Sequence, residues 1–175
     1  KLPLKGLDRS TIANTMLIHE GNTLWFSMRY KGFEGIVEYD TVSNLTTKIF
    51  DLKSSMSPIQ VVSLIKIGDY FWVGTDKGLL EFSIKEAKVK RTFATLGLLP
   101  QGITQLVPFE GNLLFGGSTG LFVFSPNSFN IIGRYTKDSG LISGQAESLA
   151  VKGGTILVGT TVVLSLPLNS WTMIL

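Results

Sequence analysis

Three acidic residues and one histidine carry the only hint of catalytic or metal chemistry in this sequence. Glu34, Glu38 and Asp40 follow one another closely, and Glu38 and Asp40 share one face if the segment is a strand, because strand side chains alternate with a period of two. Such a pair could act in acid–base catalysis or hold a cation. We favour the simpler interpretation, a polar stripe on the outer face of a strand.

The single histidine, His19, precedes the turn-forming segment Glu20-Gly21-Asn22, and no serine is marked as its partner in a catalytic triad. We interpret it as a solvated residue beside a turn. One histidine and no cysteine cannot supply the usual ligands of zinc, and the 13 carboxylates are too dispersed for a calcium loop. We therefore expect no cofactor, no metal and no catalytic residue.

Two further segments suggest anion binding and are better explained by structure. The glycine-rich stretch Gly116 to Gly120 resembles a phosphate cradle, but the residues after it predict a strand, whereas phosphate loops lead into a helix. The basic run Lys85 to Arg91 is typical of an edge strand protected by lysines. Asp76 lies inside a turn, where carboxylates accept backbone N–H bonds. We expect no nucleic-acid partner.

Composition favours stacked β-sheets. Of 175 residues, 44% are hydrophobic and 17% charged, and phenylalanine, valine, isoleucine and threonine are frequent, which argues against disorder. The most apolar stretch, Thr155 to Leu168, is shorter than the ~20 residues that span a bilayer, so no membrane insertion is expected. Because the chain starts at Lys1 without a signal-like segment, we expect a processed or excised product, whose compartment the residues leave unknown.

One hairpin pattern recurs along the chain and organises it. Phe71 to Ser83 consists of two apolar runs around a glycine-containing turn, and variants of it recur three times. If Trp25, Trp72, Phe115 and Leu157 are equivalent, the repeats are 47, 43 and 42 residues apart, which is the range of propeller blades. The spacing thus predicts four similar units.

Each unit contains two more predicted strands, one on either side of the hairpin. The first strands are expected at residues 14–18, 61–65, 103–107 and 146–151, and the fourth at 45–50, 89–93, 130–135 and 171–175. Tight turns are expected between the first and second strands, at Glu20-Gly21-Asn22, Gly68-Asp69, Glu110-Gly111-Asn112 and Gly153-Gly154. The prediction is an all-β fold: one β-propeller segment, residues 1–175, with four four-stranded antiparallel blades at about 11–56, 57–99, 100–142 and 143–175.

We expect these blades to be part of a larger propeller. Residues 1–5 occupy the place of an outermost strand of a preceding blade, and the apolar outermost strand predicted at 171–175 is followed by no connection to a next blade. Bare apolar flanks on the first and last blades would have to be covered. The expected cover is further blades of the parent chain or a second copy; the alternative is a small closed ring latched by Leu2 to Leu4.

Residues 72–79, Trp-Val-Gly-Thr-Asp-Lys-Gly-Leu, together with Gly97-Leu98-Leu99-Pro100, resemble the two-component regulator propeller repeat. That family forms the extracytoplasmic sensor propellers of bacterial hybrid histidine kinases, and related repeats occur in surface proteins of secretion machinery. The resemblance covers about residues 6–166. It implies a sensor or cell-surface propeller located in the periplasm or at the cell surface.

The function predicted from these observations is non-catalytic binding of a protein or of a small-molecule or oligosaccharide ligand. Strand order places the turns between second and third strands on the same face as the connections between blades, where loops are available for binding. The first of these turns is the longest, and we expect Met28 to Glu34 to be an exposed loop whose binding residues are Arg29, Tyr30, Lys31 and Phe33. The alternatives are a structural propeller subunit of a large assembly and, less favoured, a propeller hydrolase or lyase.

Overall fold

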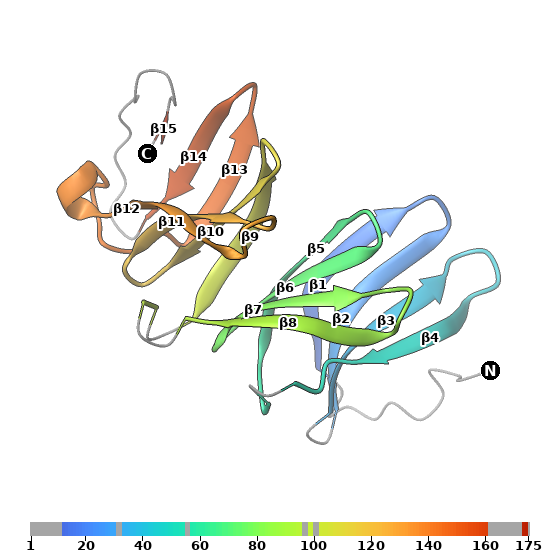
Figure 1. Ribbon diagram of the computed structural model, residues 1–175. Helices are drawn as coiled ribbons and strands as arrows, with labels where there is room; N and C mark the ends of the chain where they lie inside the picture. Colours follow the sequence, from blue (N-terminus) through green and yellow to red (C-terminus); the bar gives the residue numbers. More distant parts are fainter. Residues whose placement is uncertain are drawn as a thin grey trace. The chain divides into compact units, whose positions relative to one another are not determined.

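The computed structural model describes residues 12–30, 33–54, 57–95, 98–99, 102–160 and 173–174. Within these ranges the secondary structure is almost entirely β, and the one helical element is a 3-10 turn, η1 (Lys137–Ser139). The strands form four sheets in which strands adjacent in the sequence lie side by side, as Figure 1 shows. The prediction of an all-β chain built from four-stranded antiparallel units is confirmed at this level.

The first two sheets are antiparallel meanders of four consecutive strands. The first sheet contains β1 (Ile12–Glu20), β2 (Thr23–Tyr30), β3 (Phe33–Asp40) and β4 (Leu45–Asp51). The second sheet contains β5 (Val61–Ile67), β6 (Tyr70–Thr75), β7 (Gly78–Ser83) and β8 (Lys88–Ala94). In both sheets the middle strands come from the hairpin that recurs in the sequence.

The third sheet repeats this meander, and the fourth departs from it. The third sheet contains β9 (Ile103–Phe109), β10 (Asn112–Gly117), β11 (Gly120–Ser125) and β12 (Asn130–Tyr135). The fourth contains β13 (Ser148–Lys152), β14 (Thr155–Gly159) and β15 (Met173–Ile174). β15 pairs with β14 in parallel, so the expected antiparallel outermost strand at 171–175 is wrong for Met173 and Ile174. Residues 171, 172 and 175 of that predicted strand lie outside the described residues, as do residues 1–5.

The turns predicted between first and second strands are present in all four sheets, and each has two residues between the paired strands. Residues on either side of each turn pair directly, as Glu20 does with Thr23 and Lys152 with Thr155. Their register also corrects one predicted equivalence. Counted from the turn, Leu114 occupies the position of Trp72, and Phe115 occupies that of Val73. Phe115 therefore lies on the opposite face of its sheet from the position that we assigned to it.

The turns between third and fourth strands share a finer pattern in three sheets. Asp40, Ser83 and Ser125 each accept a hydrogen bond from the backbone N–H three residues later, at 2.6, 3.1 and 3.3 Å. The fourth residue after each of them is Asn44, Ala87 or Phe129, and all three have left-handed backbone with φ of 52–54°. A polar side chain that satisfies the turn and a left-handed residue that closes it are thus repeated features of the fold.

The chain divides into two compact units. The first consists of Lys1–Thr75 with Leu79–Thr92, and the second of Asp76–Gly78 with Phe93–Leu175. In the first unit, one face of the first sheet packs on one face of the second, with Trp25 and Ile36 opposite Phe71, Val73 and others. The rings of Trp25 and Phe71 meet edge to face at 6.1 Å, and both are buried. Trp72 is buried as well.

The second unit buries both faces of its third sheet. One face packs on the fourth sheet through Leu114, Leu121 and Val123, opposite Leu149, Ile156 and Val158. The other face carries an aromatic cluster in which ring centroids lie 5.1 to 6.4 Å apart. The cluster consists of Phe93, Phe115, Phe122, Phe124 and Phe129. Aromatic contacts of this kind add to the stabilisation from apolar burial.

Replacing Ala87 by glycine should stabilise the protein. Ala87 is exposed and has φ of 53°, a conformation that disfavours a Cβ atom, so Ala87→Gly should raise the free energy of unfolding by ~0.5–1 kcal/mol. Urea denaturation measures the change. As a matched control in the same turn, Lys85→Gly adds backbone freedom without relieving a left-handed residue and should destabilise. A loss of stability in Ala87→Gly would contradict the assigned turn geometry.

Candidate functional site

The turns between second and third strands lie beside the segments that link successive sheets, and we call this side of each unit the connection face. In the first unit, Ile59 of the linking segment and Val61 at the start of β5 bond to side chains at the end of the β2–β3 hairpin. In the second unit, the Thr119 hydroxyl donates to the carbonyl of Leu98, and the N–H of Ala146 donates to the carbonyl of Gly117 at 3.0 Å. The predicted sharing of one face is thus confirmed inside each unit.

Arg29 and Glu34 form the centre of the connection face in the first unit. They lie directly opposite each other on β2 and β3, and Arg29 Nε donates to Glu34 Oε2 at 2.8 Å. A terminal guanidinium nitrogen of Arg29 donates to the Ile59 carbonyl at 2.8 Å, and the N–H of Val61 donates to Glu34 Oε1 at 2.9 Å. The pair therefore fastens the linking segment to the hairpin.

This arrangement corrects the prediction that Met28 to Glu34 is an exposed loop. Strand pairing continues to the opposed residues Tyr30 and Phe33, which leaves two residues between the strands. Met28 is 4% exposed and Glu34 8%. The hairpin departs from those of the second and third sheets by having strands of eight residues instead of six, and the opposite charges of Arg29 and Glu34 pair within the extension.

The structure describes the four predicted binding residues to different extents. Arg29 lies on the connection face with 38% of its side-chain surface exposed. Tyr30 and Phe33 are the last paired residues of β2 and β3, so their backbones lie at the tip of the hairpin. The side chains of these two residues, and the whole of Lys31, lie outside what the structure describes.

The three carboxylates considered for catalysis do not converge. Glu34 accepts hydrogen bonds from the Arg29 guanidinium group and from the N–H of Val61. Glu38 accepts from Trp25 Nε1 at 3.3 Å and from the Thr47 hydroxyl at 2.7 Å, and it pairs with Lys48. Asp40 accepts from the backbone of the β3–β4 turn, and the bond from Ser43 holds the pKa of its carboxyl below the ordinary value. Glu38 and Asp40 share one face of β3, as expected, but this is the face on which Trp25 and Ile36 pack against the second sheet, so the interpretation of an outward polar stripe is wrong for Glu38, whose side chain is 16% exposed.

His19 lies exposed near the end of β1, one residue before the β1–β2 turn, as the interpretation of a solvated histidine requires. The described residues contain no group of three or more histidine and carboxylate side chains that could hold a metal ion. The turn after Gly116 leads into strand β11, which confirms that the glycine-rich stretch does not precede a helix. Asp76 lies in the β6–β7 turn, and its backbone packs against Gly102.

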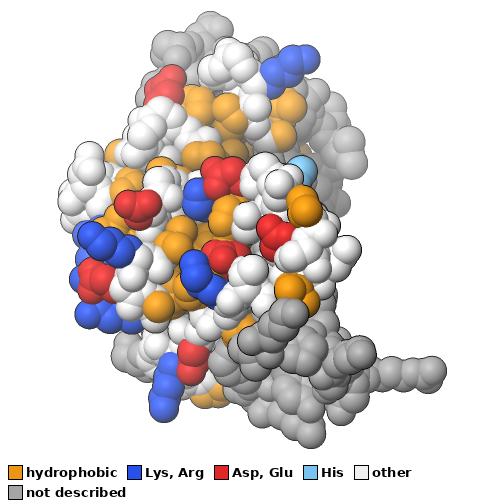
Figure 2. All heavy atoms as spheres, turned by 90° about the vertical axis from the view of Figure 1, so that its right-hand side faces the viewer, with side chains coloured by type: hydrophobic (Ala, Val, Ile, Leu, Met, Phe, Trp, Pro, Cys, Tyr) orange, Lys and Arg blue, Asp and Glu red, His pale blue; other side chains and the backbone are white. Residues whose placement is uncertain are grey.

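A mixed-charge cluster covers the outer edge of Trp25. The ammonium group of Lys66, from the second sheet, lies 5.1 Å from the centre of the indole ring and donates to Glu20 Oε2 at 2.6 Å. With Glu38 on the other side, the indole has both a cation over its face and an acceptor for its N–H. Figure 2 shows acidic and basic side chains interspersed around hydrophobic ones on one face of the molecule.

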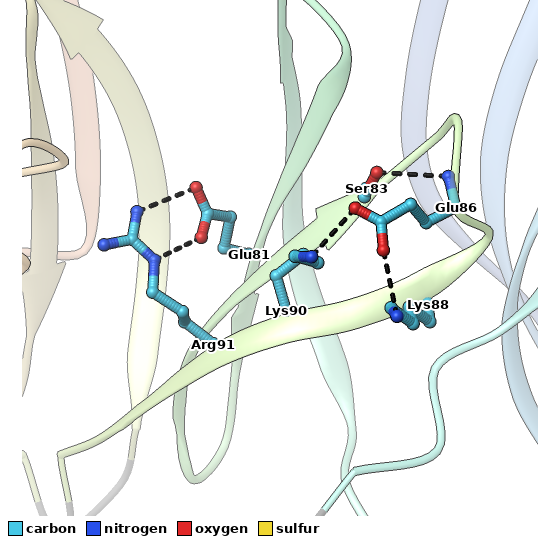
Figure 3. A network of polar contacts seen from close by, with 6 residues as sticks. All are labelled: Glu81, Ser83, Glu86, Lys88, Lys90 and Arg91. Carbon is cyan, nitrogen blue, oxygen red and sulfur yellow. Dashed lines mark hydrogen bonds and ion pairs between the residues drawn. The ribbon is translucent and has the colours of Figure 1, made fainter.

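The basic run Lys85 to Arg91 lies at an edge of the second sheet, as predicted. β8 is the last strand of this sheet, and its basic side chains pair with acids from β7 and the β7–β8 turn. Figure 3 shows Arg91 facing Glu81 through two hydrogen bonds, and Glu86 between Lys88 and Lys90. Glu81 and Arg91 occupy the positions that Glu38 and Lys48 hold in the first sheet, so an ion pair between third and fourth strands is repeated.

Lys90 and Lys88 should control the titration of Glu86. Hydrogen bonds from these two ammonium groups lower the pKa of Glu86 from 4.5 to about 2. Because the folded-state pKa is the lower one, the contribution of Glu86 to stability is present above about pH 4.5 and is lost as the pH falls towards 2. In the double variant Lys88→Met/Lys90→Met, the pKa of Glu86 should rise towards its ordinary value, measured by NMR titration of the side-chain carboxyl. An unchanged pKa would show that neither lysine pairs with Glu86.

Breaking the Arg29–Glu34 pair from one side should be more harmful than removing both charges. Arg29→Met keeps the apolar stem but leaves the buried carboxylate of Glu34 without its cation, which should cost ~2 kcal/mol of unfolding free energy. Glu34→Gln preserves an oxygen for the Val61 N–H. The double variant should therefore lose less stability than the two single variants added together.

A surface pair offers the control for this cycle. Lys48→Met removes the partner of Glu38 at a lysine whose side chain is 59% exposed, and it should change stability by less than ~0.5 kcal/mol. Chemical denaturation of the unmodified chain, the two single variants, the double variant and Lys48→Met measures these free energies of unfolding. Strict additivity of Arg29→Met and Glu34→Gln would contradict the coupling that the geometry indicates.

The sequence pointed to Arg29 but missed the role of its partners. Glu34 was considered only as a candidate acid or cation ligand, and Ile59 was not considered at all. The cross-strand register would have revealed Glu34, because a basic and an acidic residue lie opposite each other once the strands extend to Tyr30 and Phe33. The bond to the Ile59 carbonyl depends on the path of the linking segment and has no signature in the sequence.

No helix in the described part of the chain is long and apolar enough to cross a membrane. No protein-family model and no curated protein sequence matches the chain.

Solved structures are similar in fold. The computationally designed Ika4 protein superposes with a TM-score of 0.59 over 84% of this chain and 84% of its own, at 14% sequence identity. PorZ, an essential bacterial surface component of the type-IX secretion system of Porphyromonas gingivalis, superposes with a TM-score of 0.62 at 14% identity. That match covers 83% of this chain and 24% of PorZ, so the chain spans about a quarter of PorZ. At these identities the likeness concerns the fold alone.

Proposed function

We propose that this chain is a non-catalytic binding module whose four sheets are the blades of a β-propeller, or of part of one, and which binds an acidic ligand at the connection face around Arg29. The observation that carries the proposal is the state of the guanidinium group. It is fixed by Glu34 and by the Ile59 carbonyl, yet its side chain stays 38% exposed. A cation held in one orientation at the surface binds a carboxylate with little loss of conformational entropy.

The neighbouring residues support an acidic ligand. Arg29 has five N–H donors, of which Glu34 and the Ile59 carbonyl each take one. In the sequence Lys31 follows Arg29 by two residues and adds a second cation, and Tyr30 and Phe33 add two aromatic residues. Arginine and aromatic residues in combination are enriched at binding surfaces. The ligand is therefore an acidic segment of a protein or an acidic oligosaccharide.

Fold similarity supports a role at the cell surface. PorZ is a surface component of a bacterial secretion system, and it contains a region with the fold of this chain. The repeat to which residues 72–79 and 97–100 are similar is likewise found in extracytoplasmic sensors and surface proteins. We place the proposed binding module outside the cytoplasm on these two grounds, as a sensor or surface domain of the two-component regulator propeller type.

The proposal is tested by titrating the chain with two probes, a glutamate-rich peptide and an oligosaccharide of uronic acids. One of them should bind, and Lys31→Glu should weaken its affinity at least about tenfold, because charge reversal opposes an anion close to Arg29. Lys85→Glu, on the exposed β7–β8 turn, makes the same charge change elsewhere and should leave the affinity unchanged. Binding of neither probe, or equal effects of the two substitutions, would refute the acidic ligand.

A further inference from the structure

Arg134 is the only charged residue in the four strands of the third sheet, β9 to β12. Each of the first two sheets has an ion pair between its third and fourth strands, such as Glu38–Lys48 in the first. The corresponding positions of the third sheet hold Val123 and Gly133, which lie opposite each other and are uncharged. The strands of the third sheet therefore carry a cation without the carboxylate that balances a cation in the other two sheets.

The guanidinium group of Arg134 lies over an aromatic ring. Arg134 pairs with Phe122 across β12 and β11, and its guanidinium carbon lies 5.4 Å from the centre of the Phe122 ring. That ring is completely buried and stacks on the ring of Phe115 at 5.3 Å, so the aromatic cluster fixes it in place. Attraction to the face of a fixed ring restrains the cation without using any of its N–H donors.

Arg134 differs in this respect from the other arginines that the structure describes. Arg29 and Arg91 each form an ion pair with a glutamate, Glu34 and Glu81. Arg134 is exposed and pairs with no carboxylate of the described residues. All five of its N–H donors therefore remain for a ligand, and no internal carboxylate has to be displaced when an anion binds. A positive charge that its neighbours do not balance attracts anions from solution.

We propose that Arg134 is the centre of a second anion-binding site, in the second unit, and that its ligand is an acidic segment of a partner protein. The planar guanidinium group donates two N–H bonds to one carboxylate of that segment, which is the geometry in which arginine binds carboxylates most strongly. This inference rests on the proposed function for its ligand class, but the two sites share no residue.

Ile132 favours a peptide over an acidic oligosaccharide. It lies two residues before Arg134 in β12, at the point where the pairing of β11 and β12 shifts register, and it is 58% exposed. A peptide can bring an apolar side chain to Ile132 and a carboxylate to Arg134, a combination that is typical of protein interfaces. A chain of uronic acids has carboxylates but no apolar side chain, so it complements only the arginine.

The test is an NMR titration of the chain with a short, capped peptide that contains two glutamates and one leucine. The Nε–H resonance of Arg134 and the backbone N–H resonance of Gly133 should shift and saturate. The Nε–H resonance of Arg91 is the internal control and should stay unchanged, because Glu81 already pairs with it. In Arg134→Gln the affinity measured at Gly133 should fall at least about tenfold, and Arg134→Lys should lose less because it keeps the charge.

Three results would overturn the proposal. Equal shifts at Arg134 and Arg91 would show attraction without a site, and an unchanged affinity in Arg134→Gln would show that the arginine does not bind the peptide. Tighter binding of an oligosaccharide of uronic acids than of the peptide would exclude the acidic protein segment. In Lys31→Glu, which opposes an anion near Arg29, the shifts at Arg134 should persist, so the two sites are tested separately and either proposal can fail alone.

Discussion

The constraint on which this fold depends is that a sheet with apolar residues on both faces has to be covered twice. β6 and β7 show it most clearly, because side chains on both faces of these strands are buried, including Phe71 and Trp72 on opposite sides. A two-layer sandwich would leave one face of such a sheet in water. Within each unit, the packing of one sheet on its neighbour covers one face of each sheet.

Polar interactions in this protein are arranged around that stacking. The ion pairs Glu38–Lys48 and Glu81–Arg91 each tie a third strand to a fourth strand, and the capped turns of Asp40, Ser83 and Ser125 fix the ends of the same strands. At the connection face the first unit uses a buried carboxylate to hold the linking segment, while the second uses direct backbone approach at glycines. A Cβ atom on Gly116 would come within 2.4 Å of the Ala146 carbonyl oxygen. No residue with a side chain therefore fits at position 116 unless the backbone moves.

Periodicity predicted most of the strands, because alternation and turn glycines are local properties. The strand at 130–135 was predicted with the bounds that the structure has, and the two-residue turns were all found where glycine precedes or follows a polar residue. What depends on distant residues was not predictable. The extension of β2 and β3 requires the pairing of Arg29 with Glu34, and the burial of Glu34 requires Val61, 27 residues away. Aligning Phe115 with Trp72 by aromatic character also failed, because the turn sets the register and side-chain type does not.

The Arg29–Glu34 pair links these structural requirements to the proposed binding site. If Glu34 had only to satisfy the Val61 N–H, a neutral acceptor such as glutamine would avoid the desolvation of a charge. A buried carboxylate is favourable here because it also orients a guanidinium whose other side faces water. Glu34 and the Ile59 carbonyl thus hold a surface cation in place. The cost of burying the Glu34 carboxylate lowers the free energy of unfolding and is offset in part by this pairing. This division, an anion inside and a cation outside, distinguishes the first unit's connection face from that of the second, where threonine hydroxyls and backbone groups make the contacts with the linking segments.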